Sequence, residues 1–302
     1  MRTFLFSFLL MLLVSISDVF SQSVFVLGTA QDGGFPHIGC KDKCLDTYKD
    51  PSLKRFVVSL AVTDPKTKKW WLMEATPDMV DQLQYFQELT NGEYTYLPEG
   101  IFITHAHMGH YTGLMELGRE ALGANKLAVY ALPKLQAFLS SNGPWSQLVK
   151  LENISLQTLA ADVPVTLTDQ LQITAFTVPH RDEFSETAGF KIEHENKYLF
   201  IPDIDKWSKW TTDIKSAVAE VDYAFLDASF YADGELPNRA IEEVPHPFVT
   251  ETMSLFSDEA DSIKSKIRFI HFNHTNPLLW DASKQSEIQD LGFNLAEQGK
   301  GY

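Results

Sequence analysis

Three histidines that follow a short apolar segment carry the clearest chemical signal in the sequence. His105, His107 and His110 come directly after residues 101–104 and are three of only nine histidines in the chain. Side chains two positions apart on extended backbone point the same way, so His105 and His107 share one side, and His110 comes from the following turn or helix. Imidazole is the commonest metal ligand near neutral pH. The spacing therefore predicts a metal site.

Four more polar residues stand at the ends of apolar segments and are further candidate ligands. His180 and Asp203 each follow a proline, and His271 and His274 follow the apolar residues 267–270. Each has a plainer interpretation. Asp203 suits the start of a helix, His180 a turn, His271 a hydrogen-bonded core position and His274 a polar loop position. The order of the motifs along the chain favours metal binding for all four.

The segment around the three histidines resembles the His-x-His-x-Asp-His motif of the metallo-β-lactamase superfamily. Further segments resemble that family's other motifs in the same order: residues 71–78, 176–180, 198–203 and 269–277. Residues 26–36 and 224–236, with the pattern His-x-Asn-x-Thr-Asn-Pro at His271, are similar to the branch that includes the pyrroloquinoline-quinone biosynthesis B proteins and their phosphodiesterase and transfer-RNA-processing relatives.

The resemblance implies how the candidate ligands divide between two ions. The cofactor is then one or two Zn²⁺ ions, with iron or manganese as alternatives. His271 is implied as the proton donor to the leaving group, and Asp203 as a catalytic carboxylate between the ions. The ligands implied for the first ion are His105, His107 and His180, and those for the second are His110, Asp203 and His274.

One residue departs from the motif. Gly109 stands where the superfamily usually has an aspartate, so the second ion would lose a carboxylate. Either the remaining three ligands hold it or the site takes one ion. Supporting roles are implied for Glu74 or Asp78 and for Asp227. His246, between two prolines, lines either the pocket or a rigid surface loop.

Cys40 and Cys44 are the only cysteines, and both lie close after His37. Three interpretations remain open from spacing alone: a disulfide, a structural zinc held by these residues with one distant ligand, or a free dithiol.

The N-terminal residues resemble an export signal. A basic Arg2 precedes an apolar run over residues 4–16, which is too short to span a bilayer and ends near Asp18. We expect residues 1–21 to be a signal peptide cleaved after Ser21, giving a secreted or periplasmic protein without a membrane anchor. Residues 22–302 are expected to form one domain.

Charge and residue types limit the functions. A net charge of −15 and a pI near 5.0 argue against a nucleic-acid partner, because phosphate backbones attract clustered Lys and Arg. The favoured function is hydrolysis of a phosphodiester or other ester-like bond in a small molecule through a metal-activated water. The alternatives are an enzyme or accessory protein of pyrroloquinoline-quinone-type cofactor biosynthesis, with oxidative chemistry as one form of this role, and a non-catalytic metal-binding protein.

The elements that must position these residues follow from apolar periodicity and turn signals. Runs of consecutive strands alternate with amphipathic helices, which predicts an α/β protein with two mixed sheets packed face to face and covered by helices, the four-layer αββα sandwich of the resembled family. Strands are expected at residues 24–28, 55–63, 70–75, 101–104, 126–132, 165–178, 188–193, 197–201, 223–227 and 267–272. Helices are expected at residues 77–89, 111–122, 133–139, 214–221, 248–264 and 282–291.

Overall fold

The computed structural model describes residues 22–236 and 244–302. The expected signal peptide therefore lies outside the described residues. Among the residues that are described, no helix has the length and apolar character needed to cross a membrane.

Thirteen named strands in the described part of the chain form two mixed sheets, as predicted. In the first sheet β1 to β3 are antiparallel and β3 to β6 parallel. Its strands are β1 (Val24–Gly28), β2 (Ser59–Asp64), β3 (Lys69–Met73), β4 (Gly100–Phe102), β5 (Leu127–Ala131) and β6 (Ile154–Thr158).

The second sheet has the order β13-β12-β11-β10-β9-β8-β7. Strands β7 to β10 are antiparallel and β10 to β13 parallel. The strands are β7 (Pro164–Thr166), β8 (Gln172–Val178), β9 (Thr187–Glu193), β10 (Lys197–Ile201), β11 (Tyr223–Asp227), β12 (Ile267–Ile270) and β13 (Asn294–Leu295).

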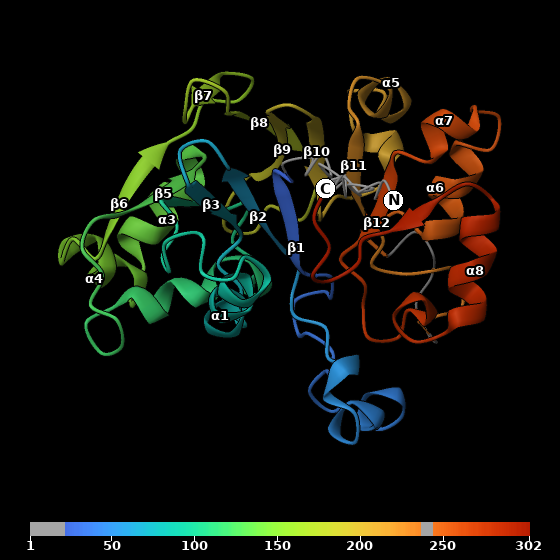
Figure 1. Ribbon diagram of the computed structural model, residues 1–302, viewed down its shortest axis with the longest axis horizontal. Coiled ribbons are helices and arrows are strands. Elements are labelled where there is room, and N and C mark those ends of the chain that lie inside the picture. The colour runs from blue at the N-terminus through green and yellow to red at the C-terminus, as the bar shows by residue number, and fades with distance from the viewer. Residues whose placement is uncertain (1–21, 237–243) are drawn as a thin grey trace, which may run out of the picture.

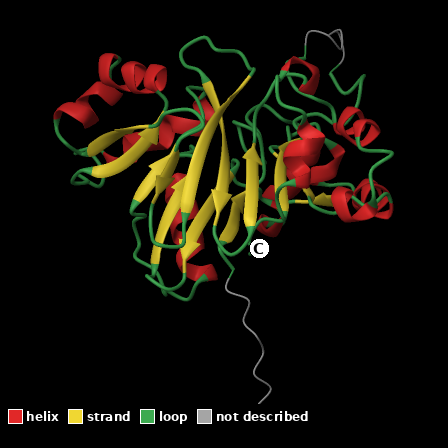
Figure 2. Ribbon diagram, turned by 90° about the horizontal axis from the view of Figure 1, so that it is seen from above, coloured by secondary structure: helices red, strands yellow, loops and turns green. Residues whose placement is uncertain are grey.

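Three apolar cores separate four layers (Figures 1 and 2). Phe102 of the first sheet and Phe190 and Phe200 of the second belong to the core between the sheets. The outer face of the first sheet packs against helices α1 (Met79–Leu89), α3 (Pro133–Ser141) and α4 (Trp145–Lys150). That of the second packs against α5 (Ile214–Ala219), α6 (Val249–Leu255) and α8 (Ala282–Asp290).

The carboxyl ends of several strands meet along one edge of this sandwich. Strands β1 and β4 run in the same direction, as do β8, β10, β11 and β12, so the loops after them emerge together. Ala30, after β1, pairs with both Val57 and Phe272 and so connects the two sheets there. Candidate ligands far apart in sequence follow these strand ends.

Two predicted helices are interrupted. In place of the helix predicted at residues 111–122, the chain forms the short helix α2 (Met108–Tyr111) and then a 3₁₀ helix, η3 (Thr112–Leu117). The amide of Gly113 donates to the carbonyl of Ala75, 2.9 Å away, instead of continuing the α-helical ladder. The helix predicted at residues 248–264 is divided into α6 and α7 (Asp261–Lys264) by a turn.

The long strand predicted at residues 165–178 is a hairpin of β7 and β8. The hydroxyl of Thr168 accepts the amides of Gln170 and Leu171, which closes the turn between them. In α1 the apolar residues Met79, Leu83 and Phe86 are buried, whereas Val80 is exposed. The prediction also missed the half-buried edge strand β6 and the two-residue β13.

Candidate metal centre

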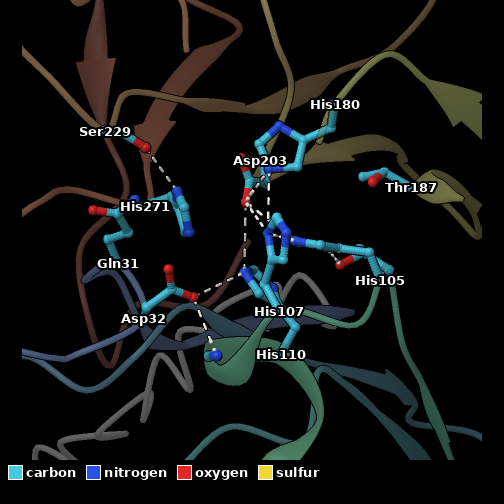
Figure 3. A network of polar contacts seen from close by, with 12 residues as sticks. Gln31, Asp32, His105, His107, His110, His180, Thr187, Asp203, Ser229 and His271 are labelled. Carbon is cyan, nitrogen blue, oxygen red and sulfur yellow. Dashed lines mark hydrogen bonds and ion pairs between the residues drawn. The ribbon is translucent and has the colours of Figure 1, made fainter. Parts of the chain in front are cut away.

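Four of the predicted ligands converge in one place. We call His105, His107, His180 and Asp203 the first cluster; each offers one ligand atom, all within 4.8 Å of one another. Nε2 of His105 lies 2.7 Å from Nδ1 of His107 and 3.3 Å from Oδ2 of Asp203. Nε2 of His180 lies 3.2 Å from the same oxygen. Figure 3 shows these side chains pointing toward Asp203.

Backbone contacts bring the strand ends of the first cluster together. The amide of Asp205, after β10, donates to the carbonyl of Pro179, after β8, at 2.7 Å. This bond places His180 beside Asp203. The amide of Ile204 donates to Oδ2 of Asp227 at 3.1 Å, which ties β10 to the end of β11.

A second cluster lies next to the first. It consists of Asp32, His110 and His271, again with one ligand atom each within 4.8 Å of one another. Nε2 of His110 lies 3.5 Å from Oδ1 of Asp32 and 3.8 Å from Oδ2 of Asp203. Asp203 therefore stands between the two clusters.

Other side chains fix which ring nitrogen faces each cluster. Nδ1 of His105 lies 2.8 Å from the hydroxyl of Thr104, and Nε2 of His107 lies 2.9 Å from a carboxylate oxygen of Glu183. Nδ1 of His271 lies 2.9 Å from the hydroxyl of Ser229. Such outer partners orient metal-binding imidazoles in proteins.

Glu74 contacts residues that belong to or support both clusters. Its carboxylate accepts the hydroxyl of Thr104 at 2.7 Å and lies 3.2 Å from Nδ1 of His110. Of the two supporting residues considered, Glu74 thus occupies that role and Asp78 does not. Asp78 accepts the amide of Val57 at 2.9 Å, because it begins α1 and faces the chain that enters β2.

Two residues at the centre have left-handed backbone conformations that are unusual outside glycine. Glu74 has φ 73° and His271 has φ 69°. Such conformations cost about 1–3 kcal/mol and persist only when surrounding contacts enforce them. Here the amide of Glu74 donates to Phe102, and that of Phe272 donates to Thr29, both at 2.8 Å.

Asp227 and His246 form the predicted supporting layer. Nδ1 of His246 lies 2.9 Å from Oδ2 of Asp227 and 3.2 Å from Oδ1 of Asp203. Asp227 also accepts the amide and hydroxyl of Ser229 at 2.9 and 2.8 Å. Asp227 and His246 also form a possible ligand group with Asp203 and His271, and His246 is buried beside Asp203 rather than on a surface loop.

The electrostatics match these contacts. Burial raises the pKa of Asp203, but the charges of His180 and His246 outweigh it and hold that pKa well below the usual range. Burial, together with the charge of His110, lowers the pKa of His105 well below its usual value. For His110, burial is outweighed by Glu74 and Asp32, whose carboxylates raise the pKa to about 9.

The clusters fit metal cations on chemical grounds. Both rings are fully buried, yet Nε2 of His110 and Nε2 of His271 have no hydrogen-bond partner in the described part of the chain. Leaving buried polar atoms without partners is costly. Imidazole nitrogens with one or two carboxylates are a typical ligand set for zinc, and for iron or manganese.

Comparison with known proteins identifies the family. The model of the beta-lactamase superfamily domain matches residues 69–275, more than half of the chain. The chain belongs to the metallo-β-lactamase superfamily. It is 26% identical to coenzyme PQQ synthesis protein B of Methylorubrum populi, over 91% of this chain and 98% of that protein. The corresponding protein of Xanthomonas campestris is 23% identical over 91% and 98%.

Solved structures share the metallo-β-lactamase fold. The Zn²⁺-bound PqqB of Methylobacterium extorquens superposes with a TM-score of 0.75 at 23% identity, covering 92% of this chain and 99% of that one. A diphosphatase from the PhnP family gives 0.66 at 20% identity, covering 93% and 96%. Human tRNase Z, short form, gives 0.57 at 17% identity, covering 93% and 98%.

His274 is predicted as a ligand of the second ion, but the structure does not place it in the clusters of this metallo-β-lactamase centre. Its ring stacks on that of His37 at 4.1 Å, and it belongs to neither cluster nor to any other ligand group found in residues 22–236 and 244–302. After His271 the amide of Asn273 donates to the carbonyl of Ser229, and the amide of Asn276 donates to the carbonyl of Asn273, both at 2.9 Å. His271 belongs to the second cluster instead, and its predicted proton donation stays a prediction.

The cysteine alternatives are also resolved. Cys40 and Cys44 form a disulfide, with their Cα atoms 5.9 Å apart. The structural zinc and the free dithiol are therefore wrong, because both sulfurs are bonded to each other. His37 lies beside His274 rather than in a zinc site.

Several residues of the centre were not identified as functional from sequence. Asp32, Ser229 and Glu183 all contact predicted ligands. Asp32 had a visible signal, since an acidic residue in Asp-Gly-Gly follows a buried strand just as the histidines do. Ser229 and Glu183 stand in ordinary loop sequence.

The centre is open to solvent on one side. Side-chain exposure is 28% for Asp32, 11% for His107 and 47% for Glu183, whereas His110 and His271 are fully buried. A small molecule approaching from this side meets the outer atoms of both clusters.

Proposed function

We propose that the protein is a metal-dependent hydrolase acting on a phosphodiester or other ester-like bond of a small molecule. The observation that carries the proposal is the placement of two ligand clusters that share Asp203, open to solvent on one side. Two of the fold relatives are named as a diphosphatase and a transfer-RNA nuclease, and a third is a zinc-bound protein.

Each side chain then has a defined task. His105, His107 and His180 would hold one ion, and His110 and His271 the other, with Asp203 between them. Bound zinc would act as a Lewis acid that polarises the bond to be cleaved, and it would lower the pKa of a bound water to about 7. Glu183, Thr104 and Ser229 keep the imidazoles oriented.

His246 is our candidate for holding a proton beside the reacting bond. Burial lowers its pKa, but the carboxylates of Asp227 and Asp203 outweigh burial and raise it to about 9. In the metal-free protein it is therefore protonated at neutral pH, and its Nδ1 atom lies 3.2 Å from Asp203. A protonated imidazole in this position suits donation to a leaving group.

The rim of the opening favours a substrate with an apolar part. Met108 follows His107 and Phe184 follows Glu183, and both side chains are more than half exposed. Phe184 also packs against Phe138 with ring centroids 5.4 Å apart. An aryl ester would combine a scissile bond at the clusters with an aromatic group against this rim.

The proposal is tested by loading metal-free protein with zinc, manganese or iron and assaying bis-nitrophenyl phosphate, nitrophenyl esters and lactones. We expect turnover that depends on metal and is lost in Asp203→Asn. The matched control is Asp205→Asn, whose carboxylate bonds to Lys206 and Lys209 outside the clusters. Absence of metal-dependent turnover with every metal and substrate would contradict the proposal.

A second candidate is a role in pyrroloquinoline-quinone-type cofactor biosynthesis. It is favoured by the alignment over 98% of the length of a coenzyme PQQ synthesis protein B. A site rich in histidine with few carboxylates also suits Fe(II) and oxygen chemistry. Iron bound after anaerobic purification, together with oxygen uptake on adding a quinone precursor, would favour this role over hydrolysis.

We also propose that the protein is exported and cleaved after Ser21. The Cys40–Cys44 disulfide supports export, because disulfides persist mainly in oxidising compartments. Sequencing the N-terminus of protein recovered from outside the cytoplasm tests this, and a mature chain that retains residues 1–21 would contradict it.

A further inference from the structure

Gly109 and Asp32 lie in unusually close contact. A Cβ atom built on Gly109 would lie 2.2 Å from Oδ1 of Asp32 and 2.6 Å from its Cα. Contacts this short do not occur between real side chains, and a backbone atom cannot move aside as a flexible side chain can. Position 109 therefore admits only glycine while Asp32 occupies this space.

The carboxylate that fills this space faces the second cluster. Oδ1 of Asp32 accepts the amide of Gly109 at 3.1 Å and lies 3.5 Å from Nε2 of His110 (Figure 3). Nε2 of His110 and Nε2 of His271 are fully buried and make no hydrogen bond to the residues that the structure describes. Three potential ligand atoms thus meet, and two of them make no hydrogen bond within residues 22–236 and 244–302.

The backbone around Asp32 is held independently of any ion. The amide of Gly34 donates to the carbonyl of Gln31 at 2.7 Å, which makes residues 31–34 a tight turn, and Gly34 has φ 68°. The amide of Gln31 donates to the carbonyl of Phe272 at 2.8 Å, next to His271. The turn is therefore fixed against the strand end that carries another member of the cluster.

We propose that Asp32 is a metal ligand of the second cluster and supplies, from the turn after β1, the carboxylate that position 109 lacks. The proposal rests on the metal binding assumed in the proposed function but not on hydrolysis. Asp32 and Gly109 are then a compensating pair, because the carboxylate and the space for it come from different segments. A two-ion centre follows, despite the glycine in the histidine motif.

The first experiment compares zinc binding to metal-free wild type and Asp32→Asn. Asparagine keeps the size of the side chain and an oxygen that accepts the amide of Gly109, but it loses the charge. We expect two ions per chain in wild type by elemental analysis and calorimetry. In Asp32→Asn we expect the second ion to bind more than about a hundredfold more weakly, since even outer partners of ligands typically contribute about 10–100-fold.

The second experiment exchanges the two residues. Gly109→Asp alone should clash with Asp32, lowering the melting temperature and the zinc content. The double variant Asp32→Gly with Gly109→Asp removes the contact with Oδ1 but keeps the contact with the Cα atom of residue 32 at 2.6 Å. Its melting temperature should therefore lie above that of Gly109→Asp alone and below that of wild type. Such partial recovery is a coupling between two sites that independent effects do not produce.

The matched control is Asp78→Asn, a half-buried carboxylate beside the same turn that bonds to Val57 and belongs to neither cluster. It should leave the count at two ions. Two ions bound with unchanged affinity in Asp32→Asn, or a single ion in wild type, would overturn the proposal. If zinc counts follow Asp32 while no substrate is hydrolysed, the hydrolase proposal fails and this one stands.

Discussion

The two clusters of the metal centre differ in how their residues are distributed along the chain. In the first cluster, His105 and His107 stand two positions apart, and His180 and Asp203 follow strands of the second sheet. The second cluster combines His110 with Asp32 and His271, which are separated by most of the sequence. The first is anchored by a local motif, and the second by contacts between the two sheets.

The comparison shows that a local motif determines where its own ligands lie. It does not determine whether the set of ligands for each ion is complete. A strand end and a turn place His105, His107 and His110 whatever follows at position 109. The second cluster is completed only because Ala30 pairs with both Val57 and Phe272, which brings the turn after β1 and the end of β12 together. The second ion should therefore be the more sensitive to substitutions away from the histidine motif.

The largest effect is expected from Asp203→Asn, because its carboxylate lies between the clusters. Its Oδ2 is 3.3 Å from His105, 3.2 Å from His180 and 3.8 Å from His110. We expect both ions to bind more than about a hundredfold more weakly, because the loss of a direct ligand should exceed the loss of about 10–100-fold typical of outer partners. Calorimetric zinc titration measures both steps. Loss of one ion only would mean that the clusters do not share Asp203.

A smaller and asymmetric effect is expected from Glu74→Gln. Oε1 of Glu74 accepts the hydroxyl of Thr104 and lies 3.2 Å from Nδ1 of His110, so an N–H group in its place would face Nδ1–H of His110. The remaining oxygen would accept only the backbone amide of Thr104, as Oε2 does at 3.2 Å. We expect the second ion to bind about 10–100-fold more weakly and the first ion to change little. Glu88→Gln, on the exposed face of α1, is the control. An equal loss at both clusters would contradict the asymmetry.

The pH dependence of zinc binding should also distinguish the clusters. His110, with a pKa of about 9 in the metal-free protein, is protonated at neutral pH and must lose that proton to bind an ion. Affinity at the second cluster should therefore rise about tenfold per pH unit below this pKa, one proton being released. Chelator competition between pH 6.5 and 8.5 measures it. His105, whose pKa is well below the usual value, contributes no such slope at the first cluster.

The smallest effect on the centre is expected from replacing both cysteines by serine. The disulfide closes a very short loop, so its removal should reduce the free energy of unfolding by about 2 kcal/mol or less. Zinc content should not change, because neither cysteine belongs to a cluster. Thermal unfolding and elemental analysis measure the two quantities. Loss of one zinc per chain would restore the structural-zinc interpretation.

Much of this fold could be predicted because the signals are local. Strands β1, β10 and β11 have the predicted bounds, since each is a short apolar run between turn residues. The interruption after α2 could not be predicted, because the carbonyl of Ala75 that takes the amide of Gly113 comes from a different element. The hairpin of β7 and β8 was missed although Thr168 sits at its turn, because the apolar pattern continues on both sides.

By itself, the sequence determined the two-sheet architecture, the family and most residues of the first cluster, because periodicity and motif spacing are read within one segment. Only the tertiary structure decided whether His271 or His274 belongs to the second cluster, and whether Glu74 or Asp78 supports it. It also brought Asp32 beside Gly109. Those choices depend on a left-handed backbone at residue 271 and on how the turn after β1 packs against another strand. Both features depend on contacts with other segments of the chain, so the residues at these positions do not encode them alone.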